Sequence, residues 1–354
     1  MLYLTLILCF ITSIIITPFV KKLAYKIGAT DKPNQRKVHQ KVMPRLGGLA
    51  IYISFIVGYL VLRPEDEYSF AILLGSFVIV ITGVLDDMFE ISAKLKLLGQ
   101  LVAAGIVVIY GGVQIDYINL PFFGVLDFEY LSIPITILWI VGITNAINLI
   151  DGLDGLAAGV SSIALITISG MAIIMGDAFV TAMGFLVLGS TLGFLIYNFH
   201  PAKIFMGDTG ALFLGYMISV LSLLGFKNVT MISFIVPIII LGVPISDTFF
   251  AIIRRIVHKQ PLSAPDKSHL HHCLLRLGYS HRTTVLLIYG MAALFGLAAI
   301  VFSQATVWVS IVVLFVLLLI IELVVEKIGL VGKGYRPLIK MYRGLRYSYA
   351  KQKQ

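Results

Sequence analysis

Charged residues are scarce in this sequence. Asp, Glu, Lys and Arg make up 13% of its 354 residues, whereas a typical soluble domain carries about 25%. Hydrophobic residues make up 59%, and they form uncharged runs long enough for a helix to cross a bilayer, which takes roughly 20 residues. No stretch of the chain fits a soluble domain. The composition therefore predicts an all-α integral membrane protein.

Cysteines are few and internal repeats are lacking. Only Cys9 and Cys273 are present, the first in an apolar run and the second in a polar loop, which excludes a disulfide framework. Without a repeat, a transporter built from two matched halves gets no support. The net charge of +9 would suit a nucleic-acid partner, but the charges lie in loops between apolar runs. We therefore expect membrane lipids, and no nucleic acid, around this chain.

The apolar runs predict about eleven transmembrane helices. The first run is followed by Lys21 and Lys22 and has no small-residue cleavage site, so it is interpreted as a retained helix rather than a signal peptide. Residues 1–326 are expected to form one polytopic transmembrane domain and residues 327–354 a basic cytoplasmic tail. The predicted spans are 2–20, 46–62, 70–87, 97–113, 131–149, 156–175, 179–197, 211–226, 230–253, 284–303 and 306–326.

The distribution of positive charge predicts the orientation. With the N-terminus outside, 25 of the 27 Lys and Arg residues fall in inner segments, and only Arg63 and Lys227 lie outside. This is the bias that the positive-inside rule describes, and it places the C-terminus in the cytoplasm. The outer segment 112–130 follows Gly111 and contains Pro121, and is expected to form a hairpin or a short re-entrant element.

Residues able to do chemistry collect on the predicted cytoplasmic side. All seven histidines fall there, at positions 39, 200, 258, 269, 271, 272 and 281. Most of the acidic residues lie on the same side: Asp31, Asp86, Asp87, Glu90, Asp151, Asp154, Asp208 and Asp266, with Asp247 just inside a span. This distribution indicates one functional face, turned towards the cytoplasm.

Adjacent carboxylates end the third predicted span. Asp86 and Asp87 repel each other at a membrane boundary and lose hydration there. A divalent cation would offset both costs, and Mg²⁺ prefers carboxylate oxygens together with substrate phosphates. A solvated helix end would explain the same pair equally well.

A second polar motif ends the fifth span. Asn145, Asn148 and Asp151 are spaced by three and share one helical stripe. The glycines around Asp154 then break the helix and free backbone N–H groups for a ligand. Polar groups at membrane depth favour a functional interpretation, although a capped helix end would explain the glycines.

Two further motifs lie in inner loops. Between spans seven and eight, the segment from Asn198 through Lys203 and Phe205 to Asp208 suits a phosphate pocket at a helix start, although Asp208 could simply cap the helix. Further on, His269, His271 and His272 could contact a diphosphate. No complete tetrahedral set supports zinc instead, and a solvated histidine-rich loop is the simpler alternative.

The first inner loop and the ninth span add further candidates. Arg36, His39 and Arg45 lie in a basic loop, which anionic lipid alone would explain. Asp247 lies within the span, where a lipid-facing carboxylate costs about 2.5–3.5 kcal/mol. We therefore expect it to face a polar cavity and to pair with Arg254, which lies on the same helical face.

Taken in order, these motifs resemble the polyprenyl-phosphate N-acetylhexosamine-1-phosphate transferases, a glycosyltransferase family 4 type. The similarity covers nearly the whole chain. The motifs that carry it are Asp86-Asp87, Asn148-x-x-Asp151-Gly-x-Asp154-Gly, Phe205-Met206-Gly207-Asp208 and His269-x-His271-His272. Pro44-Arg45-x-Gly47-Gly48 and Pro244-x-x-Asp247 resemble the branch that uses UDP-N-acetylglucosamine. The acidic motif ends in Glu90, where many relatives have Asp or Asn.

The resemblance implies a role for each matching residue. Asp208 would bind Mg²⁺, or Mn²⁺ in its place, with Asp87 and Asp151 as further metal ligands. Asp86 and Asp87 would complete the metal and lipid-phosphate site, and Phe205 would stack on uracil with Asn198 nearby. The catalytic set would then be Asp86, Asp87, Asp208, His269, His271 and His272. The substrate-binding set would be Arg36, His39, Arg45, Lys94, Lys96, Asn145, Asn148, Asp151, Asp154, Asn198, Phe205 and Asp247.

The expected reaction transfers N-acetylglucosamine 1-phosphate from UDP-N-acetylglucosamine to undecaprenyl phosphate at the plasma membrane. Both substrates are anionic, so the cation and the inner Lys and Arg side chains would screen their repulsion. Direct attack by the lipid phosphate is preferred over a covalent aspartyl intermediate. A cation-coupled transporter, another UDP-N-acetylhexosamine as substrate, and a structural scaffold are the alternatives. The sequence leaves open the downstream pathway, and whether the protein forms a homodimer.

Overall fold

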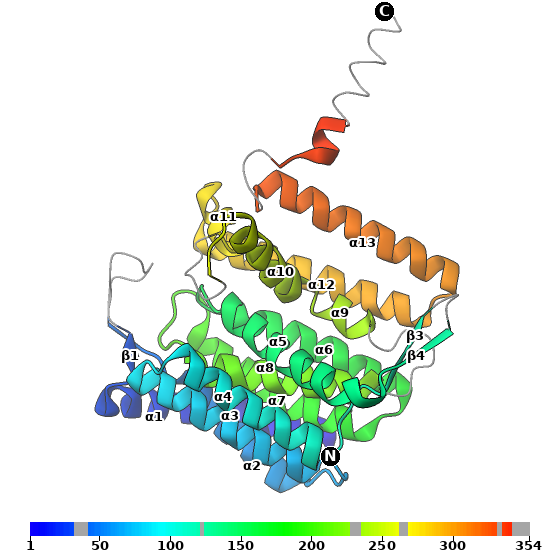
Figure 1. The fold of residues 1–354 in the computed structure, drawn as a ribbon. Coiled ribbons are helices and arrows are strands. Elements are labelled where there is room, and N and C mark those ends of the chain that lie inside the picture. Colours follow the sequence, from blue (N-terminus) through cyan, green and yellow to red (C-terminus); the bar gives the residue numbers. More distant parts are fainter. Residues whose placement is uncertain (32–41, 121–123, 227–234, 262–267, 331–334, 342–354) are drawn as a thin grey trace, which may run out of the picture.

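The computed structural model describes residues 1–31, 42–120, 124–226, 235–261, 268–330 and 335–341. Most of them are in long helices that share one general direction (Figure 1). Nine helical segments are long and apolar enough to cross a membrane: α1 (Leu2–Ile27), α3 (Ser69–Phe89), α4 with its π-helical end η1 (Ala93–Tyr110), η2 with α5 (Glu129–Ile150), α6 (Leu156–Met175), α7 (Ala178–Asn198), α8 (Gly207–Phe226), α12 (His281–Gln304) and α13 (Val307–Ile328).

A tenth apolar helix, α2 (Gly47–Leu62), is shorter. Within the described ranges, the protein is thus an all-helical multi-pass membrane protein with nine or ten candidate transmembrane helices. Ten of the eleven predicted spans correspond to one helix each.

The predicted span 230–253 is different, because its described part is not one continuous helix. It contains the short α9 (Ile235–Ile240), a turn at Leu241, and α10 (Gly242–Val257). A proline ring clashes with the carbonyl four residues earlier when a helix runs through it. Pro244 would meet the carbonyl of Ile240 in this way, and it is tolerated instead in the first turn of a new helix. The break allows α10 to take its own direction (Figure 1).

Helix α8 forms the centre of the bundle. It is buried along its whole length and packs against α3, α5, α2 and α6. Its sequence suits this position, because small and apolar residues follow Asp208 on every face of the helix. Helix α13 lies at the edge instead and packs mainly on α12 (Figure 1). Apart from Lys327 in the last turn, its exposed side chains are apolar, as expected for a helix that faces lipid.

Two short antiparallel sheets lie at opposite ends of the bundle (Figure 1). Strand β1 (Thr30–Asp31) pairs with β2 (Met43–Pro44) close to α1, and α11 (Leu270–Arg276) packs instead on α12. At the other end, β3 (Tyr117–Leu120) pairs with β4 (Gly124–Asp127). The second pair confirms the hairpin predicted within 112–130.

The start of α2 touches the start of α8 directly. The Gly48 N–H donates to the Met206 carbonyl at 2.8 Å, and a Cβ on Gly48 would lie 1.9 Å from the Gly210 nitrogen. Only glycine therefore permits this contact between the two backbones. The contact brings the loop that carries Arg45 to the helix start that carries Asp208.

Candidate active site

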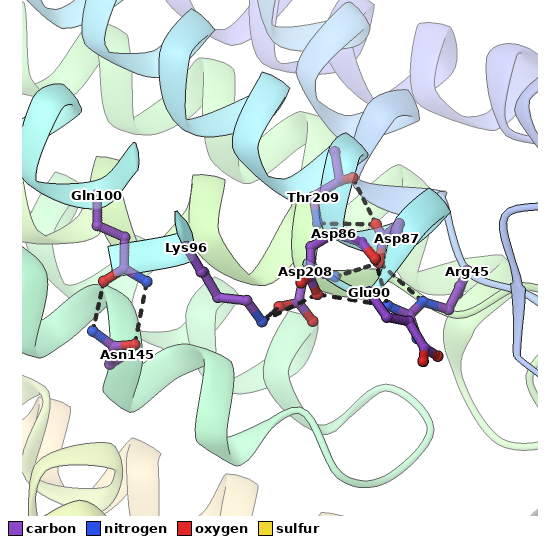
Figure 2. A network of polar contacts seen from close by, with 9 residues as sticks. All are labelled: Arg45, Asp86, Asp87, Glu90, Lys96, Gln100, Asn145, Asp208 and Thr209. Atoms are coloured by element: carbon purple, nitrogen blue, oxygen red, sulfur yellow. Dashed lines mark hydrogen bonds and ion pairs between the residues drawn. The ribbon is translucent and has the colours of Figure 1, made fainter. Parts of the chain in front are cut away.

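Four helix ends from distant parts of the chain meet at one end of the bundle. They are the end of α3, the start of α4, the end of α5 and the start of α8 (Figure 2). A pocket of about 510 Å³ opens beside them. Its lining includes the acids Asp31, Asp151, Asp154 and Asp208, the histidines His200, His272 and His281, and Arg45, Asn198 and Phe205.

Asp87 fixes the start of α8. Its Oδ1 accepts hydrogen bonds from the Asp208 N–H at 2.9 Å and the Arg45 Nε at 3.2 Å. Its Oδ2 accepts from the Thr209 N–H at 3.0 Å and the Thr209 hydroxyl at 2.6 Å. A carboxylate has about four lone-pair sites, and these donors use all of them. Asp87 is buried, and in this arrangement it caps α8 and orients Asp208 (Figure 2).

The neighbouring Asp86 contacts different groups. Lys96 from α4 lies between Asp86 and Asp208: its Nζ is 3.1 Å from the Asp86 Oδ2 and also pairs with the Asp208 carboxylate (Figure 2). Adjacent helical residues point about 100° apart, so the two carboxylates differ in most of their contacts, although Arg45 reaches both: its Nη2 lies 3.6 Å from the Asp86 Oδ2. Asp87 is bonded to the backbone at the start of α8, whereas Asp86 also faces Lys96.

Arg45 joins the acidic groups from the α2 side. It contacts Asp87, donates from Nη2 to the Asp86 carbonyl at 3.1 Å, and lies 3.6 Å from Glu90. Burial alone would lower the pKa of the Arg45 guanidinium, but the charges of Asp87 and Asp208 outweigh burial and raise that pKa. Glu90 is highly exposed, and a solvated ion pair of this kind contributes at most about 1 kcal/mol.

Backbone pairing places Phe205 in the pocket wall. The Phe205 N–H donates to the Pro44 carbonyl at 2.8 Å, and the Gly47 N–H donates to the Phe205 carbonyl at 3.0 Å. Arg45 and Phe205 thus form a parallel β-bridge. Two motifs that lie far apart in the sequence are in this way one local structure.

Asp151 ends α5, and its carboxyl lies among other acidic groups. Burial first, and then the charges of Asp208, Asp87 and Asp154, raise the pKa of its carboxyl to about 8. Among the described residues, no donor side chain offsets the charge of its ionised form. A divalent cation between Asp151 and Asp208 would offset it, and carboxylate oxygens are ligands that Mg²⁺ and Mn²⁺ accept. The residues present therefore fit a hard divalent cation.

This raised pKa predicts that cation binding depends on pH. Below pH 8 the cation must displace a proton from Asp151, so the apparent affinity for Mg²⁺ should rise about tenfold per pH unit and level off above pH 8. Thermal unfolding of the detergent-purified protein, titrated with Mg²⁺ at pH 6.5, 7.5 and 8.5, measures this affinity. The Asp151→Asn variant should lose the pH dependence. An affinity that does not change with pH in the unmodified protein would contradict the assignment.

Asn145 forms an amide pair rather than part of the pocket lining. Its Nδ2 donates to the Gln100 Oε1 at 2.7 Å, and the Gln100 Nε2 donates back to the Asn145 Oδ1 at 3.2 Å (Figure 2). Gln100 lies one helical turn beyond Lys96, so the pair fixes α4 against α5 next to the lysine. Asn148 follows on the same helix and accepts the Asp151 N–H through its backbone carbonyl.

Asn198 and Asp154 bind backbone groups of the loops around the pocket. The Asn198 Oδ1 accepts the Gly155 N–H at 3.1 Å, and its Nδ2 donates to the Ile204 carbonyl at 3.0 Å. The Asp154 Oδ2 accepts the Ala202 N–H at 3.0 Å. Both side chains therefore tie the loop after α5 to the loop before α8, and both also line the pocket.

The three motif histidines have different positions. His272 lines the pocket, whereas His269 and His271 are buried. Burial first, and then the neighbouring His272, lower the pKa of His271 to about 3, so its ring is neutral. A Cβ on Gly152 would lie 2.3 Å from the His271 Nε2, so the ring packs directly on the backbone beside Asp151.

Asp247 holds the start of the histidine motif in place. Its Oδ2 lies 3.0 Å from the His269 Nδ1, and its Oδ1 accepts the Leu270 N–H at 2.8 Å. We expected Asp247 to face a polar cavity. The structure instead buries its carboxylate inside the protein, where it caps the start of α11. Arg254 donates from Nη1 to the Leu330 carbonyl at 2.7 Å.

Three of the predicted substrate-binding residues are not placed at the pocket by the structure. Arg36 and His39 lie in 32–41, outside the described residues. Lys94 is exposed on the first turn of α4. His200, which lies within the predicted phosphate-pocket motif that begins at Asn198, and His281 also line the pocket, although neither was among the predicted site residues. His281 belongs to no local motif, because it meets His200 only when α12 packs beside the loop after α7.

Comparison with known proteins adds independent information. The profile of glycosyl transferase family 4 matches residues 69–226, which run from the start of α3 to the end of α8. A probable undecaprenyl-phosphate N-acetylglucosaminyl 1-phosphate transferase of Bacillus subtilis is 53% identical over 338 residues, covering 95% of this chain and 94% of that protein. A decaprenyl-phosphate N-acetylglucosaminephosphotransferase of Mycolicibacterium smegmatis is 37% identical over 82% of this chain and 81% of that protein. A phospho-N-acetylmuramoyl-pentapeptide-transferase of Halalkalibacterium halodurans is 33% identical over 87% of this chain and 98% of that protein.

Proposed function

Because the chain belongs to glycosyl transferase family 4, we propose that it transfers N-acetylglucosamine 1-phosphate from UDP-N-acetylglucosamine to undecaprenyl phosphate. The products are undecaprenyl-diphosphate-N-acetylglucosamine and UMP. The name of the Bacillus subtilis relative, which is 53% identical, supports undecaprenyl phosphate as the acceptor and N-acetylglucosamine 1-phosphate as the transferred group, and the pentapeptide transferase is less similar, at 33%. Such a transfer is a first membrane step in cell-envelope polymer synthesis.

One observation carries the proposal: carboxylates and cations from four helix ends meet beside a pocket at the end of the membrane bundle. Asp151 and Asp208 line this pocket together with Arg45, and Lys96 bridges Asp208 to the neighbouring Asp86. A transporter would place its acids along a pathway near the bilayer midplane. Here they lie where a water-soluble nucleotide and a lipid headgroup can meet.

The proposed metal site uses two carboxylates that line the pocket. Asp208 and Asp151 would hold Mg²⁺, or Mn²⁺ in its place, and the bound cation would neutralise charge on the phosphates. Asp87 was also expected to be a metal ligand. Its four hydrogen bonds support a different role, in which it holds the Asp208 backbone in position.

The side chains of this chain would then position two anions for direct transfer. An oxygen of the lipid phosphate forms a bond to the β-phosphorus of the nucleotide sugar, and the bond from that phosphorus to the bridging oxygen breaks, releasing UMP. Arg45 and Lys96 screen the repulsion between the anions. The acceptor phosphate has its second pKa near 6, so only a residual proton remains to be accepted. Asp86 suits this step better than Asp87, because the Asp87 oxygens are already bonded.

The proposed orientation follows the positive-inside rule, with eleven membrane-crossing segments, the N-terminus outside and the pocket in the cytoplasm. The opposite placement of the β3–β4 hairpin and of the pocket-side strands β1 and β2 supports this orientation (Figure 1). Residues 1–326 form the transferase domain and 327–354 a cytoplasmic tail. In the described part of this tail, the Leu338 and Ile339 N–H groups donate to Glu326 of α13.

The decisive experiment measures UMP release by the purified protein with a panel of radiolabelled UDP-sugars. With polyprenyl phosphate and Mg²⁺ present, release from UDP-N-acetylglucosamine should exceed release from its epimers and muramoyl relatives. Without the lipid acceptor, no UMP should form and no radiolabelled phosphate should remain on the protein. Uptake into vesicles without UMP release would contradict the proposal and favour a transporter.

A further inference from the structure

His200 lies in the wall of the pocket with one ring nitrogen already engaged. Its Nδ1 is 2.9 Å from the Asp154 Oδ2, which also accepts the Ala202 N–H. The side chain keeps 39% of its surface exposed, and it lines the pocket that Asp208 and Asp151 also line. A carboxylate that accepts from Nδ1 leaves Nε2 as the nitrogen that can reach a ligand.

A second contact fixes the plane of the His200 ring. The His281 ring stacks on it, with 4.3 Å between the centroids and 22° between the planes. His281 is itself held, because its Nε2 accepts the Asp154 N–H at 3.0 Å. Asp154 thus bonds both imidazoles, one through its carboxylate and one through its backbone. The His200 ring is held by the loop after α5 and by the start of α12.

The charge of the pocket favours further donors for an anionic ligand. Four aspartates line it, and Arg45 is the one Lys or Arg side chain among its described lining residues. A nucleotide sugar brings a diphosphate into this space, and a hydrogen-bond donor in the described wall would help to offset the acids. An imidazole whose Nδ1 is held by a carboxylate, and whose Nε2 is free, can donate to a second anion when both nitrogens carry protons.

We propose that His200 is a further substrate-contacting residue, whose Nε2 donates a hydrogen bond to a phosphate oxygen of the nucleotide sugar. Asp154 and His281 are then positioning residues that fix the His200 ring. This assignment rests on the proposed function, and it changes the role of Asp154 from direct contact with the nucleotide sugar to orientation of its neighbour.

A metal ion is the other ligand that these residues could take. One potential ligand atom each from Asp154, His200 and His281 lie within 4.8 Å of one another. Two observations favour the anion instead. The bond between Asp154 and His200 and the bond between the Asp154 N–H and His281 already use these polar atoms. The rings are also stacked face to face, whereas imidazoles that share a tetrahedral metal point towards it from different directions.

Two conservative variants separate the two ring nitrogens. The amide nitrogen of Asn lies near the position of the histidine Nδ1, and the amide nitrogen of Gln lies near that of Nε2. His200→Asn therefore keeps a donor for Asp154 and loses the donor for phosphate, while His200→Gln does the reverse. We expect His200→Asn to lower kcat/KM for UDP-N-acetylglucosamine roughly 10- to 100-fold, and His200→Gln to lower it less than about tenfold. The KM for polyprenyl phosphate should change little in either variant.

The measurement is steady-state UMP release by detergent-purified protein, with thermal unfolding as a check on folding. His258→Gln is the matched control, because His258 is exposed and bonds only to its own helix among the described contacts. The reverse order of the two His200 variants, or equal losses, would overturn the proposal in favour of a structural role. Equal losses together with Zn²⁺ binding that requires His200 and His281 would overturn it in favour of a metal site. Absence of UMP release from the unmodified protein would instead overturn the proposed function, so the two failures differ.

Discussion

Replacing Asp208 by Asn is expected to lower kcat about 1,000-fold or more. Asp208 starts α8, lines the pocket and is held in position through its own N–H by Asp87. The amide cannot carry the charge that a divalent cation requires, and preorganised electrostatic stabilisation of this kind contributes about 10²–10³-fold for a single donor. Loss of a metal ion removes several such interactions at once. UMP release under saturating substrates measures the effect.

The variant should remain folded. Asp208→Asn loses a contact with Lys96 but also removes a carboxylate that repels Asp86 and Asp151, so the unfolding temperature should change little. Mg²⁺ should no longer raise it. The matched control is Asp127→Asn in the hairpin at the other end of the bundle, which should keep near-normal activity (Figure 1). Near-normal transfer by Asp208→Asn would exclude Asp208 as a metal ligand.

Replacing Asp87 by Ala is expected to destabilise the protein by about 3–5 kcal/mol. This is the usual effect of removing one partner from a buried ion pair, because the other charge is left uncompensated. Here the loss would leave Arg45 unpaired on this side and three donors at the start of α8 without their acceptor. Thermal unfolding in detergent measures the effect, and a protein too unstable to purify would agree with it. Asp87→Asn retains one oxygen and should cost less.

Glu90→Gln is the matched control for stability. Glu90 lies one turn beyond Asp86, also contacts Arg45, and has 78% of its side chain exposed. Exposed pairs of this kind contribute at most about 1 kcal/mol. If Asp87→Ala unfolded at the same temperature as Glu90→Gln but had lost all activity, Asp87 would be a catalytic or metal-binding residue and not a helix cap.

The acidic pair Asp86 and Asp87 shows which features of the site the sequence predicts and which it leaves open. The sequence predicted that two carboxylates would end the third span on the side of the chemistry, and the structure places both there. The sequence left open a shared role in metal binding or a solvated helix end, and that role stays a prediction. The structure adds that Asp87 is bonded to the backbone of α8 and that Asp86 faces Lys96. The same holds for Asn145 and Asp247, for which the structure supplied contacts that the sequence could not. Each was identified as a polar group too costly to leave unpaired in a membrane helix, and the structure adds Gln100 as a partner of Asn145 and His269 as a partner of Asp247.

The spans, the polar motifs at their ends and the bias of positive charge follow from the sequence alone. These features depend on local properties: the length of an apolar run, the spacing of residues along one helix, and the composition of one loop. The resemblance to a known family rests on the same local motifs. The hairpin within 112–130 is confirmed, and one span is interrupted where Pro244 disfavours a continuous helix.

Only the tertiary structure decided which polar atoms meet. The sequence fixes the direction of each side chain around the axis of its own helix, and says nothing of how α12 lies beside the loop after α7. A hydrogen bond requires two atoms to approach within about 3 Å, so its partner depends on the packing of segments more than a hundred residues apart. For that reason the meeting of Asp87 with α8, and of His200 with His281, could be found only in the folded molecule.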